Sequence, residues 1–457
     1  MSCTATPSVN VQFEDTQSEL PSGDSVSSDT KSLLSRSLIS LLDQIVVSGC
    51  TFFTMYLVSH NCSKAEVGAF ALAATVVNFV RTVQERAIAA PYLAFAFQPG
   101  FNRKSFRGSS FVHQGALATI VAMIVLAVVA VGWGLGFANS SLALAASLAV
   151  ALPFLMMRDQ IRANSAANFE FTPQLLLDIG VGLVQFGGLF FLAWLNQFTL
   201  AYVYIALGLA CVIPSLAWLW QHRASFEIDR RILVSDWTHN WRYSRWLVGA
   251  RVLGVIGYLA VPWMVAYYLD KSATGAFAVC SSLVGISLMF VTGLNNLFQP
   301  RTIRELHRSG IAGMKSTLIE SIVIVSSVLC LISIGFAFFG DVVLGLLFGP
   351  VYGMYGQIAF LLSLSTLSVS FSVLFGNGLA ALGNARHYFW GEFACCAVSV
   401  GSAAVLIPCW GLAGAAQALI LGGLAASLVT GLTLARAISQ FKSTEAIVKP
   451  RLMSVKP

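Results

Sequence analysis

Twelve long apolar segments occupy most of this 457-residue chain, and they limit its fold more than any other feature. An α-helix rises about 1.5 Å per residue, so about 20 apolar residues are needed to cross about 30 Å of hydrocarbon. Because backbone groups inside a bilayer must satisfy their own hydrogen bonds, such segments span it as helices. The sequence therefore predicts an all-α polytopic membrane protein with about 12 transmembrane helices. The segments lie at 37–59, 66–95, 111–133, 141–157, 173–195, 199–220, 246–268, 274–297, 316–338, 357–382, 389–408 and 411–434.

Lysine and arginine residues fall almost entirely in alternate gaps between these segments. The chain is 57% hydrophobic and only 10% charged, whereas a soluble domain carries about 25% charged residues. If the N-terminus is inside, the outer gaps contain only Lys64 and Lys271 as basic residues. Basic loops stay in the cytoplasm, so we expect a multi-pass protein of the cell (inner/plasma) membrane with both termini cytoplasmic. The net charge of +7 then reflects topology and not a nucleic-acid partner.

The gap lengths predict the organisation of the chain. The longest inner gap, 221–245, is expected to be a cytoplasmic linker between an N-terminal six-helix lobe, 33–220, and a C-terminal six-helix lobe, 246–436. Segments 1–32 and 437–457 are predicted to be cytoplasmic tails, and the first of them is polar and expected to be disordered. The outer gaps are too short to hold an extracellular catalytic domain.

The two halves contain a related motif. Residues 64–72 read KAEVGAFAL and residues 271–279 read KSATGAFAV, with identical Lys, Gly, Ala, Phe and Ala at matched positions. Both stretches lie on the outer side before a helix that runs inward, so the match indicates a parallel repeat unless it is a coincidence among small apolar residues. Repeats of this kind are typical of transporters with a substrate site between the halves. We therefore expect two pseudo-symmetric six-helix lobes around a central cavity.

Charged side chains inside the apolar segments are candidates for the lining of that cavity, because a charge at the bilayer centre costs about 2.5–3.5 kcal/mol. Asp43 and Gln44 in the first segment and Arg251 in the seventh lie at similar depths on helices that match under the repeat. We expect them to line a polar cavity between the lobes. A direct Asp43–Arg251 ion pair, snorkelling to the inner interface, and an Asp43 satisfied within its own lobe all stay open.

The second and eighth segments contain the other candidates. Arg81 and Glu85 are four residues apart, so they share a helix face and can pair, and Arg86 follows them. These residues either anchor the helix at the inner interface or present an arginine to an anionic head group. Asn295 and Asn296 occupy the matching region of the second half, where they line the same cavity or mark the end of the helix.

Other polar residues suggest no further site. Asp178, Glu320 and Glu392 follow inner gaps closely and are expected at the membrane interface. The nine cysteines and six histidines show no metal-type spacing, and no GxxxxGK[ST] phosphate loop is present. We therefore expect no metal site, no cofactor and no direct use of ATP.

Six short stretches suggest a family. They read LDQIVVSG at 42–49, KAEVGAFAL at 64–72, LFQP at 297–300, LFGPVY at 347–352, LGNAR at 382–386 and PCWGLAGAA at 408–416. In this order, over about residues 35–436, they resemble the polysaccharide (O-antigen type) flippases of the multidrug/oligosaccharidyl-lipid/polysaccharide exporter superfamily. The third to sixth segments contribute little to the resemblance.

The resemblance implies a cavity lined mainly by helices 1, 2, 7 and 8, which opens alternately to the two sides of the membrane. It implies transport of a lipid-linked oligosaccharide of the polyprenyl diphosphate type from the inner to the outer leaflet, for cell-surface polysaccharide biosynthesis. Arginines suit such a substrate because a guanidinium binds phosphate oxygens through parallel hydrogen bonds. The expected partners are this substrate, the lipid bilayer and a coupling ion, H⁺ or Na⁺, for a monomeric protein.

Two other functions remain as alternatives. A multidrug/cation antiporter of the same superfamily shares the fold but favours acidic residues deep in the cavity, whereas three arginines lie on the cavity helices here. An integral-membrane enzyme of the polysaccharide pathway needs a sizeable outer loop or a polar catalytic cluster, and the sequence shows neither. We therefore expect a transporter and not an enzyme.

Overall fold

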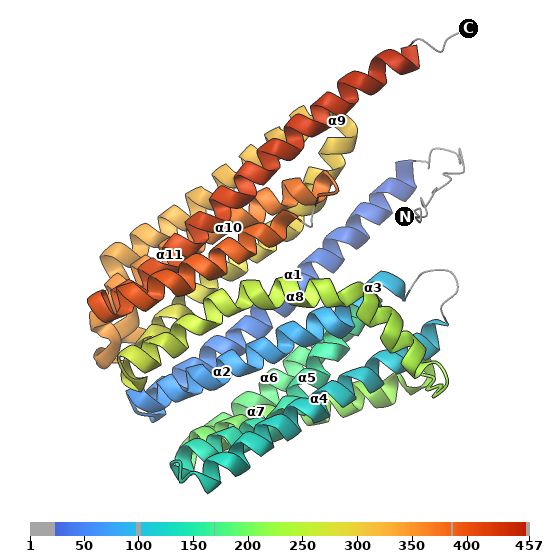
Figure 1. The fold of residues 1–457 in the computed structure, drawn as a ribbon. Coiled ribbons are helices and arrows are strands. Elements are labelled where there is room, and N and C mark those ends of the chain that lie inside the picture. Colours follow the sequence, from blue (N-terminus) through green and yellow to red (C-terminus); the bar gives the residue numbers. More distant parts are fainter. Residues whose placement is uncertain (1–22, 97–101, 169, 385–386, 454–457) are drawn as a thin grey trace, which may run out of the picture.

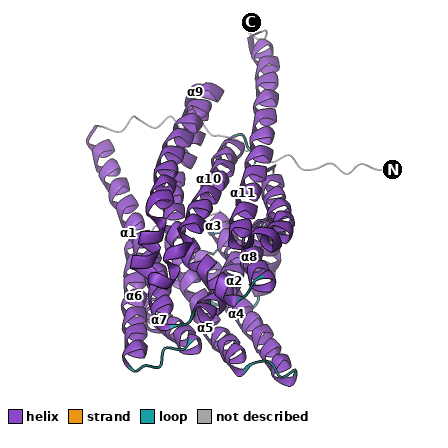
Figure 2. Cartoon of the chain, turned by 90° about the vertical axis from the view of Figure 1, so that its left-hand side faces the viewer, coloured by secondary structure: helices purple, strands orange, loops and turns teal. Residues whose placement is uncertain are grey.

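The computed structural model describes residues 23–96, 102–168, 170–384 and 387–453, and this part of the chain is helical with no strand. Figure 2 shows the helices running roughly along one common axis. This confirms the predicted all-α class. The elements are α1 (Gly23–Asn61), α2 (Lys64–Gln84), the π-helical turn η1 (Glu85–Ala89), α3 (Ala90–Phe95), α4 (Arg103–Gly134), α5 (Asn139–Ala167), α6 (Phe171–Trp194), α7 (Leu200–Gln221), the 3₁₀ turn η2 (Arg223–Ser225), α8 (Leu233–Tyr268), α9 (Lys271–Phe348), the 3₁₀ turn η3 (Pro350–Tyr355), α10 (Gly356–Ala381) and α11 (Tyr388–Met453).

Two of these elements each contain two antiparallel helices. Gly310 in α9 has φ 64° and ψ −156°, and Gly411 in α11 has φ 59° and ψ −135°. A side chain disfavours such backbone angles, so glycine lets the chain reverse there. Arg301 and Glu320 consequently form an ion pair of 2.8 Å across the Gly310 reversal. Within the described residues, ten helices are long and apolar enough to cross a membrane. Because α9 and α11 each contain two such helices, the described residues hold twelve helices of spanning length.

Several helices extend beyond the predicted apolar segments. The gap expected at 298–315 is helical on both sides of Gly310, and α5 continues to Ala167 instead of ending near residue 157. Residues 23–32 belong to α1, so this part of the predicted disordered tail is helical, while residues 1–22 lie outside the described part. Residues 233–245 of the expected linker form the first turns of α8. Each additional hydrogen bond extends a helix at little cost once it is nucleated, so polar residues follow an apolar segment without a break.

The helices gather into two groups. In Figure 1, α9–α11 lie together in yellow to red, α4–α7 form a separate group in green, and α8 runs between the two groups. The two groups make contact mainly through α2, which packs on both α8 and α9, and through α1, which packs on α9. The second helix of the N-terminal half is therefore the main bridge to the C-terminal half.

The repeated motif forms the tightest point of that bridge. A Cβ atom added to Gly68 would overlap the carbonyl oxygen of Lys271, and one added to Gly275 would overlap the carbonyl oxygen of Lys64. This reciprocal contact is what pseudo-twofold symmetry requires. Both helices begin at this point with a side-chain cap: Ser63 forms a capping box with Glu66, and Asp270 accepts from the backbone of α9.

The apolar core shows where the lobes are joined. The largest buried cluster includes Val67 and Phe70 of α2 together with Phe277, Leu344 and Phe348 of α9. At the opposite end of the bundle, where α1 begins and α11 ends, each half has its own small cluster. The lobes are therefore packed together near Lys64 and Lys271, which we call the closed end. At the other end, which we call the terminal end, the described residues of the two lobes share no buried cluster.

Candidate functional site

A cavity of about 560 Å³ lies between the two lobes on the terminal side of this closed packing. Its N-terminal wall comes from α1, α2, α5, α6 and α7, and its C-terminal wall from α8 and α9. The charged lining residues all belong to the first wall, whereas the second wall is apolar or carries hydroxyl groups. The charged residues are Arg81, Arg158, Asp159 and Arg162, and the facing wall includes Tyr258, Pro262, Phe277, Ser281, Ser282 and Met289.

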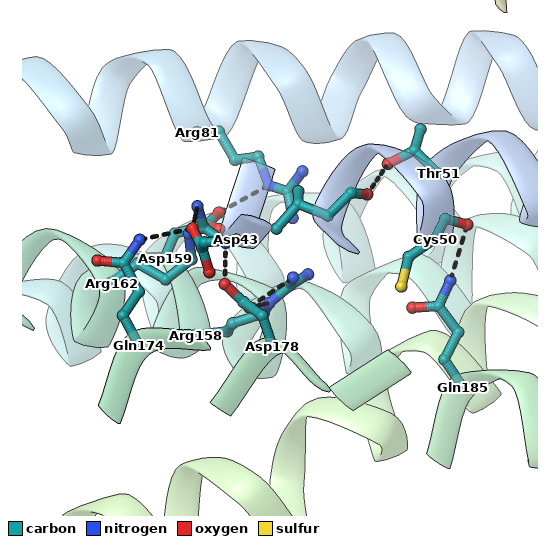
Figure 3. Close-up of polar contacts among 11 residues, drawn as sticks. Asp43, Cys50, Thr51, Arg81, Arg158, Asp159, Arg162, Gln174, Asp178 and Gln185 are labelled. Carbon is teal, nitrogen blue, oxygen red and sulfur yellow. Dashed lines mark hydrogen bonds and ion pairs between the residues drawn. The ribbon is translucent and has the colours of Figure 1, made fainter. Parts of the chain in front are cut away.

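A network of buried charges backs the N-terminal wall (Figure 3). Arg162 of α5 bridges two carboxylates: its Nη2 lies 2.9 Å from Oδ2 of Asp43 on α1, and its Nη1 pairs with Oδ2 of Asp178 on α6. Arg158 donates from Nε to Oδ1 of Asp178 at 2.8 Å. Gln174 donates from Nε2 to Asp43 at 2.7 Å. This network ties α1, α5 and α6 into one unit.

One further ion pair lies on the cavity side of this network. Nε of Arg81 on α2 lies 2.7 Å from Oδ2 of Asp159 on α5, and the two side chains are 36% and 28% exposed. In contrast, Asp43 and Asp178 are almost completely buried. Together, three arginines and three aspartates form a charge-balanced group, in which Arg81–Asp159 is the accessible pair.

The predicted pairing of Arg81 with Glu85 is wrong. Arg81 turns toward α5 and binds Asp159, while Glu85 pairs with Arg86 at 3.0 Å. The two residues are still one α-helical turn apart, because the backbone N–H of Glu85 donates to the carbonyl oxygen of Arg81, so the choice of partner is made by the neighbouring side chains Asp159 and Arg86. Arg81 thus links two helices instead of bracing one.

The two first-helix candidates face different neighbours. Asp43 is satisfied within its own lobe, by Arg162 and Gln174, which was one of the open alternatives. Gln44 is exposed and donates to Ser48 Oγ at 3.4 Å, and Ser48 lines the cavity. Of the eight predicted residues, Arg81 is the member of the described cavity lining.

The C-terminal candidates lie toward the terminal end of the cavity wall. Arg251 is exposed and precedes the lining residue Tyr258 by seven positions, so both are on one face of α8. Asn295 accepts from Nδ2 of Asn377 on α10 at 2.7 Å. The side chain of Asn296 lies outside the described part of the structure.

Sequence reasoning missed most of the charge network. Asp178 was expected at the membrane interface but is fully buried, and Arg158 and Arg162 lie just after the segment predicted to end at residue 157, although α5 continues through them. The spacing of four residues between these arginines was the available signal, because it places both on one helix face. Partners on other helices were not visible in the pattern.

No family model and no curated protein matches this sequence. Solved structures do match the fold. A lipid II flippase MurJ in an inward closed conformation aligns with a TM-score of 0.66 and 12% identity, covering 88% of this chain and 87% of that one. An inward-facing multidrug resistance MATE family transporter of the MOP superfamily aligns with a TM-score of 0.64 and 15% identity, covering 90% and 96%. The chain has the fold of these transporters.

A third structure extends the comparison to a different pocket chemistry. A MOP superfamily transporter from Pyrococcus furiosus, described by the reverse polarity of its binding pocket, aligns with a TM-score of 0.64 and 13% identity, covering 89% and 95%. Identities this low establish the common fold, not a common substrate. The shared architecture is therefore a multi-pass membrane bundle.

Proposed function

We propose that this chain is an alternating-access transporter that flips a lipid-linked oligosaccharide of the polyprenyl diphosphate type from the inner to the outer leaflet, for cell-surface polysaccharide biosynthesis. The fold supports this proposal because solved structures that share it include a MATE family transporter and a lipid II flippase. A cavity between two lobes, and not a catalytic cluster, is the main feature of the site, so we infer a transport activity and not an enzymatic one.

The accessible guanidinium of Arg81 is the observation that carries the proposal. The Arg81 side chain lies on the cavity wall and is 36% exposed, and a guanidinium can bind phosphate oxygens bidentately. The facing wall, with Phe277 and Met289, offers apolar contact to the lipid portion. The cavity volume of about 560 Å³ lies within the range of about 300–1,000 Å³ typical of small-molecule sites. It therefore suits the diphosphate and adjoining groups of the substrate.

The proposed orientation determines the side of the membrane that the cavity faces. With both termini cytoplasmic in the inner (plasma) membrane, the closed end near Gly68 and Gly275 faces outward and the cavity faces the cytoplasm. This is the state in which a substrate loads from the inner leaflet. The proposal includes a monomer in the lipid bilayer and a coupling ion, H⁺ or Na⁺, but no nucleic-acid partner.

A deletion of this gene in its own host tests the function. We expect lipid-linked glycan to accumulate on the cytoplasmic face, with loss of surface polysaccharide. The wild-type gene restores export, and Arg81→Ala, expressed at the same level, does not. Arg301→Ala is the matched control, because Arg301 forms an exposed pair with Glu320 on α9 and is not in the cavity lining. Normal export by Arg81→Ala would remove the basis of the proposal.

A multidrug/cation antiporter is the second candidate, and the partly exposed side chain of Asp159 on the cavity wall favours it. Three aspartates balance the three arginines of the network, so an organic cation could also find a counter-ion on this wall. The deletion strain discriminates between the two candidates. Normal surface glycan together with increased sensitivity to cationic drugs supports the antiporter.

A further inference from the structure

The Arg81–Asp159 pair differs from its neighbours in how easily it can be opened. In the Arg158–Asp178 pair the side chains are 8% and 0% exposed, and in the Arg162–Asp43 pair they are 20% and 4% exposed. Breaking either pair leaves a carboxylate buried without its partner, which is strongly unfavourable. Asp159 is 28% exposed and would keep access to the cavity after losing Arg81. An incoming anion therefore meets least resistance at Arg81.

The contact between the two side chains also leaves part of the guanidinium available. Oδ2 of Asp159 approaches Arg81 at its buried Nε, so this contact does not occupy the two Nη groups of Arg81. A phosphate can use these amino groups first, through two parallel hydrogen bonds. It would then place negative charge beside the Asp159 carboxylate, and the two like charges repel.

We propose that Asp159 is an internal counter-ion that occupies Arg81 while the cavity is empty and is displaced by the diphosphate of the substrate. This inference rests on the proposed function and names the chemical group that the cavity recognises. Asp159 then sets the affinity for the anion: it competes with the substrate and does not assist its binding.

Displacement of Asp159 would also weaken the attachment of α2 to α5. On the next turn, Gln84 Nε2 donates to the carbonyl oxygen of Met156 at 2.8 Å, so α2 is held to α5 by two polar contacts, and the substrate removes one. Further along, α2 accepts a hydrogen bond at Thr75 Oγ1 from Trp263 Nε1 of α8 at 2.8 Å and meets α9 at Gly68. Substrate binding thus acts on the helix that joins the lobes, which supplies the differential contact that alternating access requires.

The test measures binding of inorganic pyrophosphate to the purified full-length protein in nanodiscs. We expect Asp159→Asn to bind pyrophosphate about tenfold more tightly than wild type, because the competitor is lost. Arg81→Gln should abolish binding in both backgrounds. Glu85→Gln is the matched control: it removes one carboxylate one turn away, at a residue that pairs with Arg86, and should change the affinity less than twofold.

A competing role and a bracing role of Asp159 predict opposite changes in pyrophosphate affinity when Asp159 is replaced. If Asp159 only braces Arg81 for binding, Asp159→Asn binds pyrophosphate equally or more weakly, and the proposal is overturned. We expect Asp159→Ser to bind pyrophosphate more tightly than wild type as well, and this variant is used if Asp159→Asn does not fold. An equal gain in pyrophosphate affinity in Glu85→Gln and Asp159→Asn would also overturn the proposal, because the effect would then come from the loss of one negative charge near the cavity and not from the loss of a competitor for Arg81.

Binding of farnesyl diphosphate and of farnesol shows whether the site recognises a diphosphate attached to a lipid or a free diphosphate. Tighter binding of farnesyl diphosphate than of pyrophosphate, with no binding of farnesol, supports a lipid diphosphate; equal affinities support recognition of the free anion at the same pair. The glycan assay keeps the two proposals distinct. If Asp159→Asn binds pyrophosphate more tightly but the deletion strain has normal surface glycan, the counter-ion role of Asp159 is supported and the flippase function is contradicted. If Asp159→Asn shows no gain in affinity but the deletion strain accumulates lipid-linked glycan, the flippase function is supported and the counter-ion role is contradicted.

Discussion

Gly68 and Gly275 meet across the pseudo-twofold axis, each against the backbone of the other helix at its first turn. They are the central glycines of the two matched motifs, KAEVGAFAL and KSATGAFAV. The contact allows α2 and α9 to approach more closely than side chains would permit, as small residues do at helix interfaces in membranes. In the proposed orientation, this contact is the outer gate.

Substitution of Gly68 by alanine should therefore separate the lobes at the closed end. The added Cβ overlaps the carbonyl oxygen of Lys271, and neither backbone can yield without moving a helix. We expect a loss of about 1–3 kcal/mol in the free energy of unfolding, as for other overpacked sites, measured by thermal unfolding in detergent. Gly49→Ala is the control, since no atom lies within 4 Å of its added Cβ. Equal stability of the two variants would contradict the close packing of α2 and α9 at Gly68.

The bridging role of Arg162 predicts a large effect on stability. Arg162→Ala leaves Asp43 and Asp178 with fewer counter-charges in a buried setting, so we expect the free energy of unfolding to fall by about 3–5 kcal/mol. Arg301→Ala removes an ion pair whose side chains are 51% and 41% exposed, and should cost less than about 1 kcal/mol. Comparable losses in both variants would show that the network is not structurally important.

Arg251→Ala should leave folding and membrane insertion intact while reducing export, because Arg251 is exposed on the face of α8 that continues into the cavity. Surface polysaccharide and the amount of protein in the membrane are measured together. The double exchange Asp43→Arg with Arg251→Asp should not restore export, since Asp43 bonds to Arg162 and Gln174. Full rescue by the exchange would instead demonstrate a direct pair in another state of the transport cycle.

The proposed topology predicts opposite labelling of two exposed turns. Asn196 lies between α6 and α7, and Arg308 lies next to the Gly310 reversal. In intact cells, a membrane-impermeant maleimide should label Asn196→Cys and not Arg308→Cys, in a background where Cys62 and Cys409 are serine. After permeabilisation both should react. The inverse pattern would place the termini outside and the closed end toward the cytoplasm.

The sequence by itself predicted the long apolar helices and the relation between the halves. Apolar segments of spanning length dictate helices because the bilayer offers the backbone no other hydrogen-bond partner. The matched motifs identified the two glycines that meet at the closed end. Arg81, one of the few ionisable residues within an apolar segment, lies in the lining of the cavity between the lobes.

Only the tertiary structure decided which charges belong together. Arg162 binds Asp43, 119 positions away in the sequence, and Arg81 binds Asp159 instead of the nearer Glu85. Helical periodicity describes one helix at a time, so it finds neighbours on the same face but not partners on another helix. Burial was also decided by the tertiary structure, because Asp178 is a core residue only through the packing of α5 and α6 around it.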